Sequence, residues 1–581
     1  MSRAFLLRGA AAGVLVAAAC GGGAEAPRVA IATNLAVPKG VLDRVTKLTL
    51  TVLEGTVSCD ETATGQTSLP EGTGAAKEIA RRELVPGACA GGAKFCGDLS
   101  IEKSDAIRVF SAVAKGDGDA TLAIGCKASK IDQDALPIAI KMFRYVEPPV
   151  CDDGRIQPTE QCEPPGGVLC DDDCLTKEIQ LSIGSGQNGT QTGGPNDKLN
   201  PFLLWPAQTG TAGRMFAFYT DKALSNGNID VALRAMGDDM APLTTPPALA
   251  AGSIFLPNGP TFPPPPSPRE QSMPQAAFLG GKYYVVFQDN DTPGPTNGQD
   301  IRLRSMDGAL VAEQGATPIG INGGTDGSGE PAIQAAPAIA AGPQSRLFIA
   351  WEDAAQGKIA GRTFTPPSTL GPQNDISTGT GNKGVSIAAT PTGWVAVWQS
   401  GTGVKLRAIS DTGTPSGSEQ TVNDGGSVSE RPRVASLPDG RFAVVWSSAG
   451  DVFAQRYDAK GAKIAGDQAS AINDVVKDGD QITPAIAPAP AGGGAYVAVW
   501  LDAGTSDVRG RMLGGTSGFL FNNENGQSTE FKASRAAGRT RANPSVAVGG
   551  AGPFVAIAWE DKTSGGSGTG IVARRFPLPS E

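Results

Sequence analysis

One short pattern occurs seven times in the C-terminal two thirds of this 581-residue chain. Each copy has an apolar run that ends in an aromatic residue, then a turn-rich gap, then a segment reading Val/Ile-x-x-Arg, with Phe453 in the apolar place of the fifth copy. A chain built this way must stack many similar small units, because repeats of roughly 40–60 residues form arrays of short elements. The aromatic residues are Tyr219, Phe287, Trp351, Trp398, Trp446, Trp500 and Trp559, and the arginines are Arg234, Arg304, Arg362, Arg407, Arg456, Arg511 and Arg574.

The strands of each copy can be read from its residues. Runs such as Tyr496–Trp500 are apolar on both faces, which is typical of a strand in a sheet that is covered on both sides. A shorter strand precedes each aromatic run, and we expect proline to open it, because the first residue of a strand can lack an N–H. These prolines include Pro337, Pro432, Pro484 and Pro544. The pattern predicts a mainly β chain whose residues 177–581 form a seven-bladed β-propeller. The cycle, for example Val444–Gly461, resembles propeller-like repeats of bacterial secreted proteins.

The two ends of the repeat region suggest how the ring closes. The seventh copy includes Ile571–Arg575 but has no fourth strand after it. Ahead of the first copy, Ile179–Ile183 alternates like a short strand without a sheet of its own. We predict that these two segments pair, because closure removes exposed strand edges.

The composition excludes several kinds of catalytic site, metal site and partner. The chain has no histidine, so it has neither a Ser-His-Asp triad nor imidazole zinc ligands. Its net charge of −9, without a basic block, argues against a nucleic-acid partner. We therefore expect a protein that is not an enzyme. We also expect it to have no cofactor and to be a monomer.

The N-terminus predicts export. Gly9–Ala19 is an apolar stretch of small residues after basic residues, too short to span a bilayer. The following Cys20 and Gly21 resemble the end of a bacterial lipoprotein signal, although Ala17 stands where such signals usually carry Leu. The resemblance implies a signal peptide over 1–19, acylation of Cys20, a tether over 20–29 and an outer-membrane or cell-surface location. The alternative is an ordinary signal peptide whose cleavage leaves a free thiol.

The other eight cysteines predict disulfides. An even number in an exported chain without histidine favours disulfides over metal ligands, and 105 connectivities remain open. They are Cys59, Cys89, Cys96, Cys126, Cys151, Cys162, Cys170 and Cys174.

The first four of these cysteines fall in a segment, 30–148, that we predict to be a small β-sandwich-like domain. Leu48–Val52, Ala106–Phe110 and Pro137–Met142 alternate as strands do. A short helix is expected near Gly74–Leu84, where the residues favour helix.

The last four cysteines lie in residues 149–176. Cys151–Cys162, followed by Cys170 and Cys174, resembles the cysteine-rich repeat of myxobacterial surface proteins, although Asp152 and Thr159 replace its glycines. The resemblance implies a surface module with no known chemistry. Its aspartates offer oxygen atoms that suit Ca²⁺, but the spacing is not that of an EF-hand, and a solvated acidic loop is the favoured interpretation. These aspartates are Asp152, Asp153, Asp171, Asp172 and Asp173.

The repeated polar residues allow two interpretations. An aspartate follows the aromatic by two residues in five copies, as at Asp353. It could pair with the repeated arginine of the same hairpin, or the arginine could pack its stem on the next blade. Alternatively, a ring of arginines could meet an anionic ligand. A feature present in every copy favours the structural role, and the aromatics are likewise expected in the core. We place ligand candidates in irregular loops, mainly Asp289–Asp300 and Phe519–Gly526; the proline run Pro263–Pro266 is expected to be a connection.

Two classes of function are compatible with these sequence features. The favoured one is a surface-anchored recognition or scaffold protein that binds a glycan or protein through loops and touches the membrane only through its lipid. The alternative is a glycosidase of the sialidase or five-bladed type, which needs paired carboxylates. The Ser-x-Asp-x-Gly-x-x-Trp boxes of sialidases are absent from the sequence. The ligand-binding residues remain unassigned.

Overall fold

The computed structural model describes residues 28–145 and 176–577, with internal gaps. The gaps are 32, 37–38, 43, 56–58, 60–76, 85–94, 96–98, 132–137, 182–196, 207–213, 223–228, 239, 241–242, 244–269, 291–298, 308–317, 323–332, 424–431, 466, 468–470, 477–478, 490–493, 516–529, 537, 550–553 and 564–567. The chain divides into two units, Met1–Pro148 and Pro149–Glu581.

Both units are built almost wholly from strands. Within the described residues, helical structure comprises α1 (Lys39–Leu42), two 3-10 turns, Asp117–Asp119 and Pro343–Ser345, and the 3-10 residue Asp467. None of the helices in these ranges is long and apolar enough to cross a membrane.

The first unit contains one five-stranded sheet and two small two-stranded sheets. The five-stranded sheet has the order β4-β3-β6-β7-β9, while β1 pairs with β5 and β2 pairs in parallel with β8. The strands are β1 (Arg28–Ile31), β2 (Thr33–Ala36), β3 (Lys47–Glu54), β4 (Lys77–Leu84), β5 (Leu99–Glu102), β6 (Ser104–Lys115), β7 (Thr121–Ile131), β8 (Ile138–Lys141) and β9 (Phe143–Arg144).

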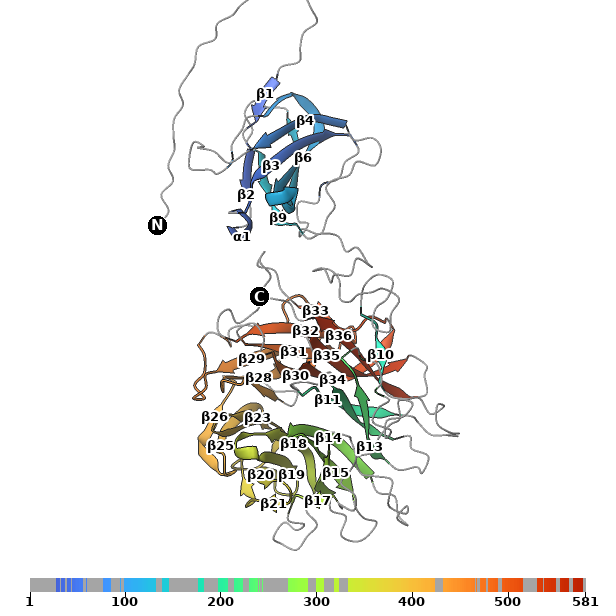
Figure 1. The fold of residues 1–581 in the computed structure, drawn as a ribbon, viewed down its shortest axis with the longest axis vertical. Helices are drawn as coiled ribbons and strands as arrows, with labels where there is room; N and C mark the ends of the chain where they lie inside the picture. The colour runs from blue at the N-terminus through green and yellow to red at the C-terminus, as the bar shows by residue number, and fades with distance from the viewer. Residues whose placement is uncertain are drawn as a thin grey trace, which may run out of the picture. The chain divides into compact units, whose positions relative to one another are not determined.

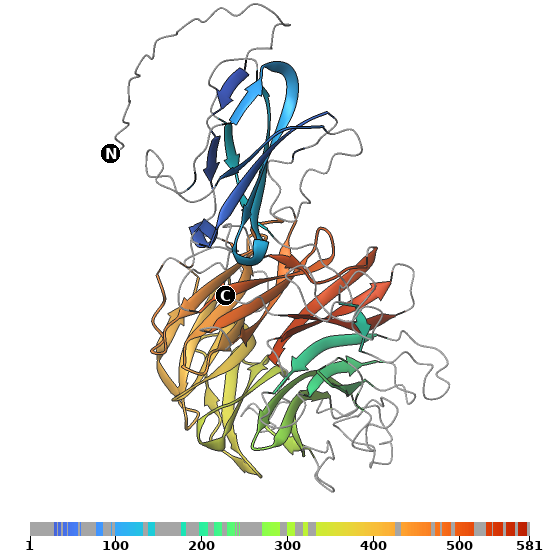
Figure 2. The same cartoon turned by 45° about the horizontal axis from the view of Figure 1, so that its top comes forward.

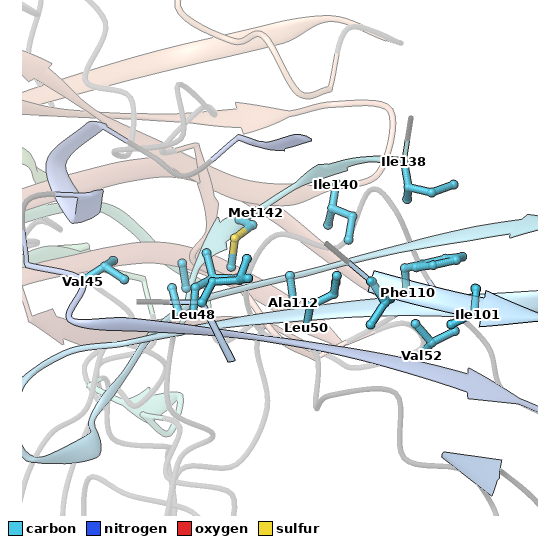
Figure 3. Packing of buried hydrophobic residues seen from close by; sticks show 14 of the residues in the cluster. Val45, Leu48, Leu50, Val52, Ile101, Phe110, Ala112, Ile138, Ile140 and Met142 are labelled. Carbon is cyan, nitrogen blue, oxygen red and sulfur yellow. The ribbon is translucent and has the colours of Figure 1, made fainter. Parts of the chain in front are cut away.

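The core of this unit is one cluster of buried residues from the five-stranded sheet and from strands β5 and β8 (Figure 3). Alternate residues of β3, namely Leu48, Leu50 and Val52, are buried, as the period of two predicts. They share one cluster with Phe110 of β6 and Ile140 of β8. The three strands predicted from sequence in this segment are therefore confirmed as β3, β6 and β8.

The predicted helix near Gly74–Leu84 is wrong, because Lys77–Leu84 is strand β4 at the edge of the sheet. Its pairing with β3 and the burial of Leu84 override a local preference for helix. The charged residues that suggested a helix instead lie on a sheet edge, where charge discourages pairing with other chains. Glu78 and Arg81 form an exposed ion pair there at 2.7 Å.

A disulfide joins Cys59, after β3, to Cys126 on β7. It connects positions 67 residues apart in the sequence. The remaining cysteines of the chain, including Cys20 and the four of the cysteine-rich module, lie outside the described residues.

The second unit contains seven antiparallel sheets that follow one another along the chain, and each sheet is open. We number them 1 to 7. Sheet 1 is β11 (Lys198–Leu204), β12 (Met215–Asp221) and β13 (Asp230–Met236); sheet 2 is β14 (Glu270–Leu279), β15 (Lys282–Asn290), β16 (Gln299–Met306) and β17 (Ile319–Gly320). Sheet 3 is β18 (Gln334–Ala341), β19 (Leu347–Asp353), β20 (Lys358–Thr365), β21 (Thr369–Leu370) and β22 (Asn374–Asp375); sheet 4 is β23 (Asn382–Thr390), β24 (Gly393–Ser400), β25 (Gly403–Ser410) and β26 (Pro415–Thr421). Sheet 5 is β27 (Arg433–Ser436), β28 (Phe442–Ser448) and β29 (Asp451–Tyr457); sheet 6 is β30 (Gln481–Ala489), β31 (Ala495–Asp502), β32 (Asp507–Gly514) and β33 (Phe531–Lys532); sheet 7 is β34 (Arg539–Gly549), β35 (Phe554–Thr563), β36 (Thr569–Pro577) and β10 (Ile179–Gln180).

The first strands of the seven sheets contact one another in cyclic order. From sheet 1 onward they are β11, β14, β18, β23, β27, β30 and β34, and β34 contacts β11 again. Green strands of sheet 1 accordingly lie beside red strands of sheet 7 in both views (Figures 1 and 2). The central strand of each sheet carries the repeated apolar run and is almost entirely buried, as in β12, β28 and β31.

The predicted pairing of the two ends is confirmed. Strand β10 pairs antiparallel with β36, with Ile179 opposite Ala573 and Gln180 opposite Val572. The next residue continues the ladder, since Leu181 N–H donates to Ile571 O at 2.8 Å. Sheet 7 thus takes its fourth strand from the beginning of the unit.

Candidate functional site

A central cavity of about 650 Å³ is lined by the first strands of all seven sheets. The polar residues of its lining are Asn200, Gln275, Ser386, Arg433, Ser436, Thr483, Asn543 and Ser545. Its apolar residues include Trp205, Ile339, Ala388, Ala487 and Val548. The size falls within the range of roughly 300–1,000 Å³ that is usual for small-molecule sites.

A repeated bulge shapes one end of this cavity. Five first strands carry a non-glycine residue with φ between 46° and 52°, followed directly by proline, and the strand pairing shifts there. The bulged residues are Asn200, Met273, Ala336, Thr483 and Asn543. Bulges bend a strand and tolerate proline, because the ladder is interrupted at that point.

The expected role of proline needs correction. It was predicted to open the first strand, but β18, β30 and β34 begin before their prolines. Pro337, Pro484 and Pro544 instead follow the bulge. Only in sheet 5, where Pro432 precedes β27, does the prediction hold.

The residue directly after the aromatic joins neighbouring sheets. At four of the seams, a side-chain oxygen at this position accepts a hydrogen bond from the N–H of the bulged position in the next sheet. Thr220 accepts from Met273 (3.2 Å), Gln288 from Ala336 (3.5 Å), Glu352 from Gly384 (2.5 Å) and Glu560 from Asn200 (2.7 Å). We call this contact the seam bond.

The repeated arginines also join sheets. Five of them donate from Nη1 to a backbone oxygen of the preceding sheet, which in four cases belongs to the residue directly after that sheet's last strand. The pairs are Arg234–Leu181 (2.8 Å), Arg362–Ile321 (2.9 Å), Arg407–Ile376 (3.0 Å), Arg511–Ile472 (3.0 Å) and Arg574–Ala533 (2.7 Å). The structural interpretation of these arginines is therefore correct, but the predicted Asp–Arg pair within a hairpin is not what they form.

Arg456 and Arg304 depart from this scheme. Arg456 forms a buried ion pair with Asp467 at 2.9 Å and donates to Gly514 O. Arg304 is buried, and its Nε and Nη1 have no hydrogen-bond partner among the described residues. Burial lowers the pKa of Arg304 and also that of Arg234.

The repeated aspartates bond mainly to the strand opposite them. In three sheets the partner is a residue of the first strand, as the register places the two side by side. The pairs are Lys198–Asp221 (2.6 Å), Gln271–Asp289 (2.7 Å) and Arg541–Asp561 (3.2 Å). Asp353 and Asp502 instead accept bonds from the turn that follows them.

The repeated aromatics form the core, as predicted. None of the seven is more than 3% exposed. Burial also raises the pKa of the Tyr219 phenol.

Glu560 is the carboxylate most closely tied to the cavity. Its Oε1 accepts hydrogen bonds from Asn200 N–H and Asn543 Nδ2, both at 2.7 Å, and both of those residues line the cavity. Burial raises the pKa of Glu560, and the hydrogen bond from Asn543 opposes this effect.

The cavity residues were not predicted from the sequence, because irregular loops were expected to bind the ligand. The loop positions 291–298 and 519–526 and the proline run 263–266 lie outside the described residues. The residues on either side of each first-strand proline carried the missed signal, since they differ between copies while the proline is present in six of the seven. No group of three acidic or cysteine side chains within the described ranges could hold a metal, and the aspartates proposed for Ca²⁺ lie outside those ranges.

Comparison with known proteins gives structural similarity only. No protein-family model and no curated protein matches the chain. Among solved structures, a Hadza microbial sialidase is 10% identical with a TM-score of 0.38, covering 92% of this chain and 90% of that one. The NanB sialidase from Streptococcus pneumoniae is 10% identical with a TM-score of 0.37, over 91% and 95%. The Trypanosoma rangeli sialidase in complex with sialic acid is 11% identical with a TM-score of 0.40, over 69% and 59%.

These neighbours require one correction. The absence of histidine led us to expect a protein that is not an enzyme, and that expectation is contradicted, because the matched structures are sialidases. The physical reason is that a glycosidase acts through carboxylates and needs no histidine. At this level of similarity, the neighbours assign neither a reaction nor a site residue to this chain.

Proposed function

We propose that residues 177–581 form a seven-bladed β-propeller whose central cavity binds a glycan. The seven successive sheets, the cyclic contacts of their first strands and the pairing of β10 with β36 support this architecture. The cavity lined by all seven first strands is the observation that carries the proposed function.

The lining suits a sugar. Amide side chains such as Asn200, Gln275 and Asn543 can pair with sugar hydroxyl groups. Trp205 and Ile339 provide apolar surface against which the C–H groups of a sugar ring can pack. Small-molecule sites generally combine apolar walls with a few placed polar groups in this way.

The test is a glycan array followed by titration calorimetry with the full chain. The variant Gln275→Trp is expected to fill part of the cavity and abolish binding of any glycan that the array identifies. Gln420→Trp, on the exposed face of β26, is the matched control and should bind normally. If no glycan binds, or if Gln275→Trp binds as the wild type does, the proposal fails.

A second candidate function is glycoside hydrolysis, favoured by Glu560. A buried carboxylic acid with a raised pKa can act as a proton donor, and hydrolysis needs a second carboxylate as its partner. Release of the chromophore from a panel of chromogenic glycosides by the wild type, lost in Glu560→Gln while glycan binding persists, would support hydrolysis. Binding without turnover across the panel would reject it.

We further propose that the protein is exported and anchored at the cell surface through Cys20. The support is the apolar stretch Gly9–Ala19 and the residues around the cysteine. Metabolic labelling with a fatty-acid analogue is expected to mark the wild type but not Cys20→Ser. Equal absence of label in both proteins would contradict the anchor.

A further inference from the structure

Two asparagines line the cavity where sheets 7 and 1 meet. Asn200 and Asn543 are the bulged residues of β11 and β34, the first strands of these two sheets, which contact each other. Their φ angles of 52° and 46° do not by themselves require asparagine, since Met273 and Ala336 adopt the same conformation at their own bulges. The backbone therefore does not dictate that an amide lines the cavity at these two positions.

The strands on this side of the cavity are tied together by two hydrogen bonds across the seam. Glu560 Oε1 accepts from Asn200 N–H at 2.7 Å, and Ser545 Oγ accepts from Leu203 N–H at 3.0 Å. Both acceptor residues are buried. A cavity wall that is already held in place loses less freedom when a ligand binds, which favours affinity.

Glu560 also orients the amide of Asn543. The same Oε1 accepts a second hydrogen bond, from Asn543 Nδ2 at 2.7 Å. The opposite orientation of the amide is disfavoured, because it would bring Asn543 Oδ1 against a carboxylate that can only accept. Asn543 is exposed and lines the cavity, so its Oδ1 is left to accept a hydrogen bond from a ligand.

The described lining of sheets 7, 1 and 2 carries amide and hydroxyl groups but no charged side chain. We infer that the glycan of the proposed function places an uncharged, hydroxyl-bearing part against Asn543 and Asn200, and that Glu560 is the positioning residue of this subsite. A sugar hydroxyl donates to Asn543 Oδ1. Glu560 acts through Asn543, since it is not one of the described residues that line the cavity. This inference rests on the proposed function and adds to it the side of the cavity and the residue that orients it.

The experiment measures binding to the full chain by titration calorimetry. The probes are three uncharged disaccharides, cellobiose, lactose and diacetylchitobiose, together with any glycan that the array retains. Asn543→Gly removes the amide at a φ that glycine adopts freely, and it should weaken binding about three- to tenfold, as expected for one hydrogen bond. Glu560→Leu should cause the same loss although the amide is still present.

Three further variants distinguish positioning from a general structural role. Glu560→Gln keeps an oxygen acceptor and should retain most of the affinity. The double variant Glu560→Leu with Asn543→Gly should lose no more than Asn543→Gly alone, because residues that act through one contact are not additive. Glu352→Leu is the matched control, since Glu352 makes the seam bond to Gly384, which has no side chain to orient. This control should bind as the wild type does.

The outcomes separate the two proposals. The inference is overturned, and the proposed function stands, if a probe binds and Gln275→Trp blocks it but Asn543→Gly binds as tightly as the wild type. Unchanged binding by Glu560→Leu, or equal weakening by Glu560→Leu and Glu352→Leu, has the same meaning. If no probe and no arrayed glycan binds, both proposals are overturned. Tryptophan fluorescence verifies the fold of each variant, and Asn543→Gly decides the inference even where Glu560→Leu does not fold.

Discussion

At the scale of single residues, the repeated positions owe their roles to their places in the ring. The aromatic of each copy fills the core, and the residue after it reaches the next sheet at four seams. The arginine reaches back to the preceding sheet in five copies. One short pattern thus contributes both to a sheet and to the two seams beside it.

Replacing one of these arginines should destabilise the second unit. Arg362→Met removes the bonds to Ile321 O and Gly371 O and leaves the carbonyls unpaired, which costs about 1–3 kcal/mol of unfolding free energy. All seven tryptophans lie in this unit, so denaturant unfolding followed by their fluorescence measures the effect. The control is Lys383→Met at an exposed position, and a variant as stable as this control would contradict the role of Arg362.

Glu560 should make the stability of this unit depend on pH. Because its pKa is raised in the folded protein, the folded state binds the proton more tightly than the unfolded chain does. The contribution to stability is therefore present below the ordinary pKa of glutamate and is lost as the pH rises through the raised pKa.

The variant Glu560→Gln tests this dependence. It keeps an oxygen acceptor for Asn200 and Asn543 but cannot ionise, so it should lose less stability than the wild type between pH about 5 and about 8. Urea unfolding at both pH values measures the difference. If the free energy of unfolding changes equally with pH in the wild type and in Glu560→Gln, Glu560 does not control the pH dependence.

At the scale of elements, the strand alternation and the apolar runs were predictable, but the details that shape the cavity were not. β3 and β8 follow the period of two, whereas five consecutive residues of β6 are buried, and the central strands of the seven sheets follow their apolar runs. Lys77–Leu84 was mistaken for helix because its residues favour helix, and only its pairing with β3 makes it a strand. The bulges at Thr483 and Asn543 place non-glycine residues at positive φ, which no local pattern reveals.

The disulfide should stabilise the first unit alone. Replacing both Cys59 and Cys126 with serine opens a loop spanning 67 positions and should cost about 2–4 kcal/mol of that unit's unfolding free energy. Scanning calorimetry should show the loss. The tryptophan-monitored transition is the internal control and should not move, since it reports only the second unit.

At the scale of the whole molecule, the second unit depends on a contact between the two ends of its own chain. Leu181, beside β10, is 1% exposed and packs in one cluster with Met236 of sheet 1 and Ala573 of sheet 7. The sequence predicted the pairing because the seventh copy lacked a fourth strand. It could not predict the ligand, because the cavity gathers three to six residues from each of seven distant segments.

Truncating this contact should weaken the entire unit. Leu181→Ala is expected to cost about 2–5 kcal/mol, as for other fully buried leucines. Gln180→Ala, one residue earlier and exposed, should change stability little. Equal unfolding midpoints for the two variants in guanidinium chloride would mean that the first residues of the unit do not hold the ring closed.

The seam bond has a consequence for how such a chain can change in length over evolution. Sheets 1 to 3 each offer an acceptor side chain to the next sheet and an N–H to the preceding one, so a duplicate of one of them arrives with both groups already in place. Ser447 and Leu501 lie where the acceptor is too short or apolar, so the copies that contain them are the least exchangeable.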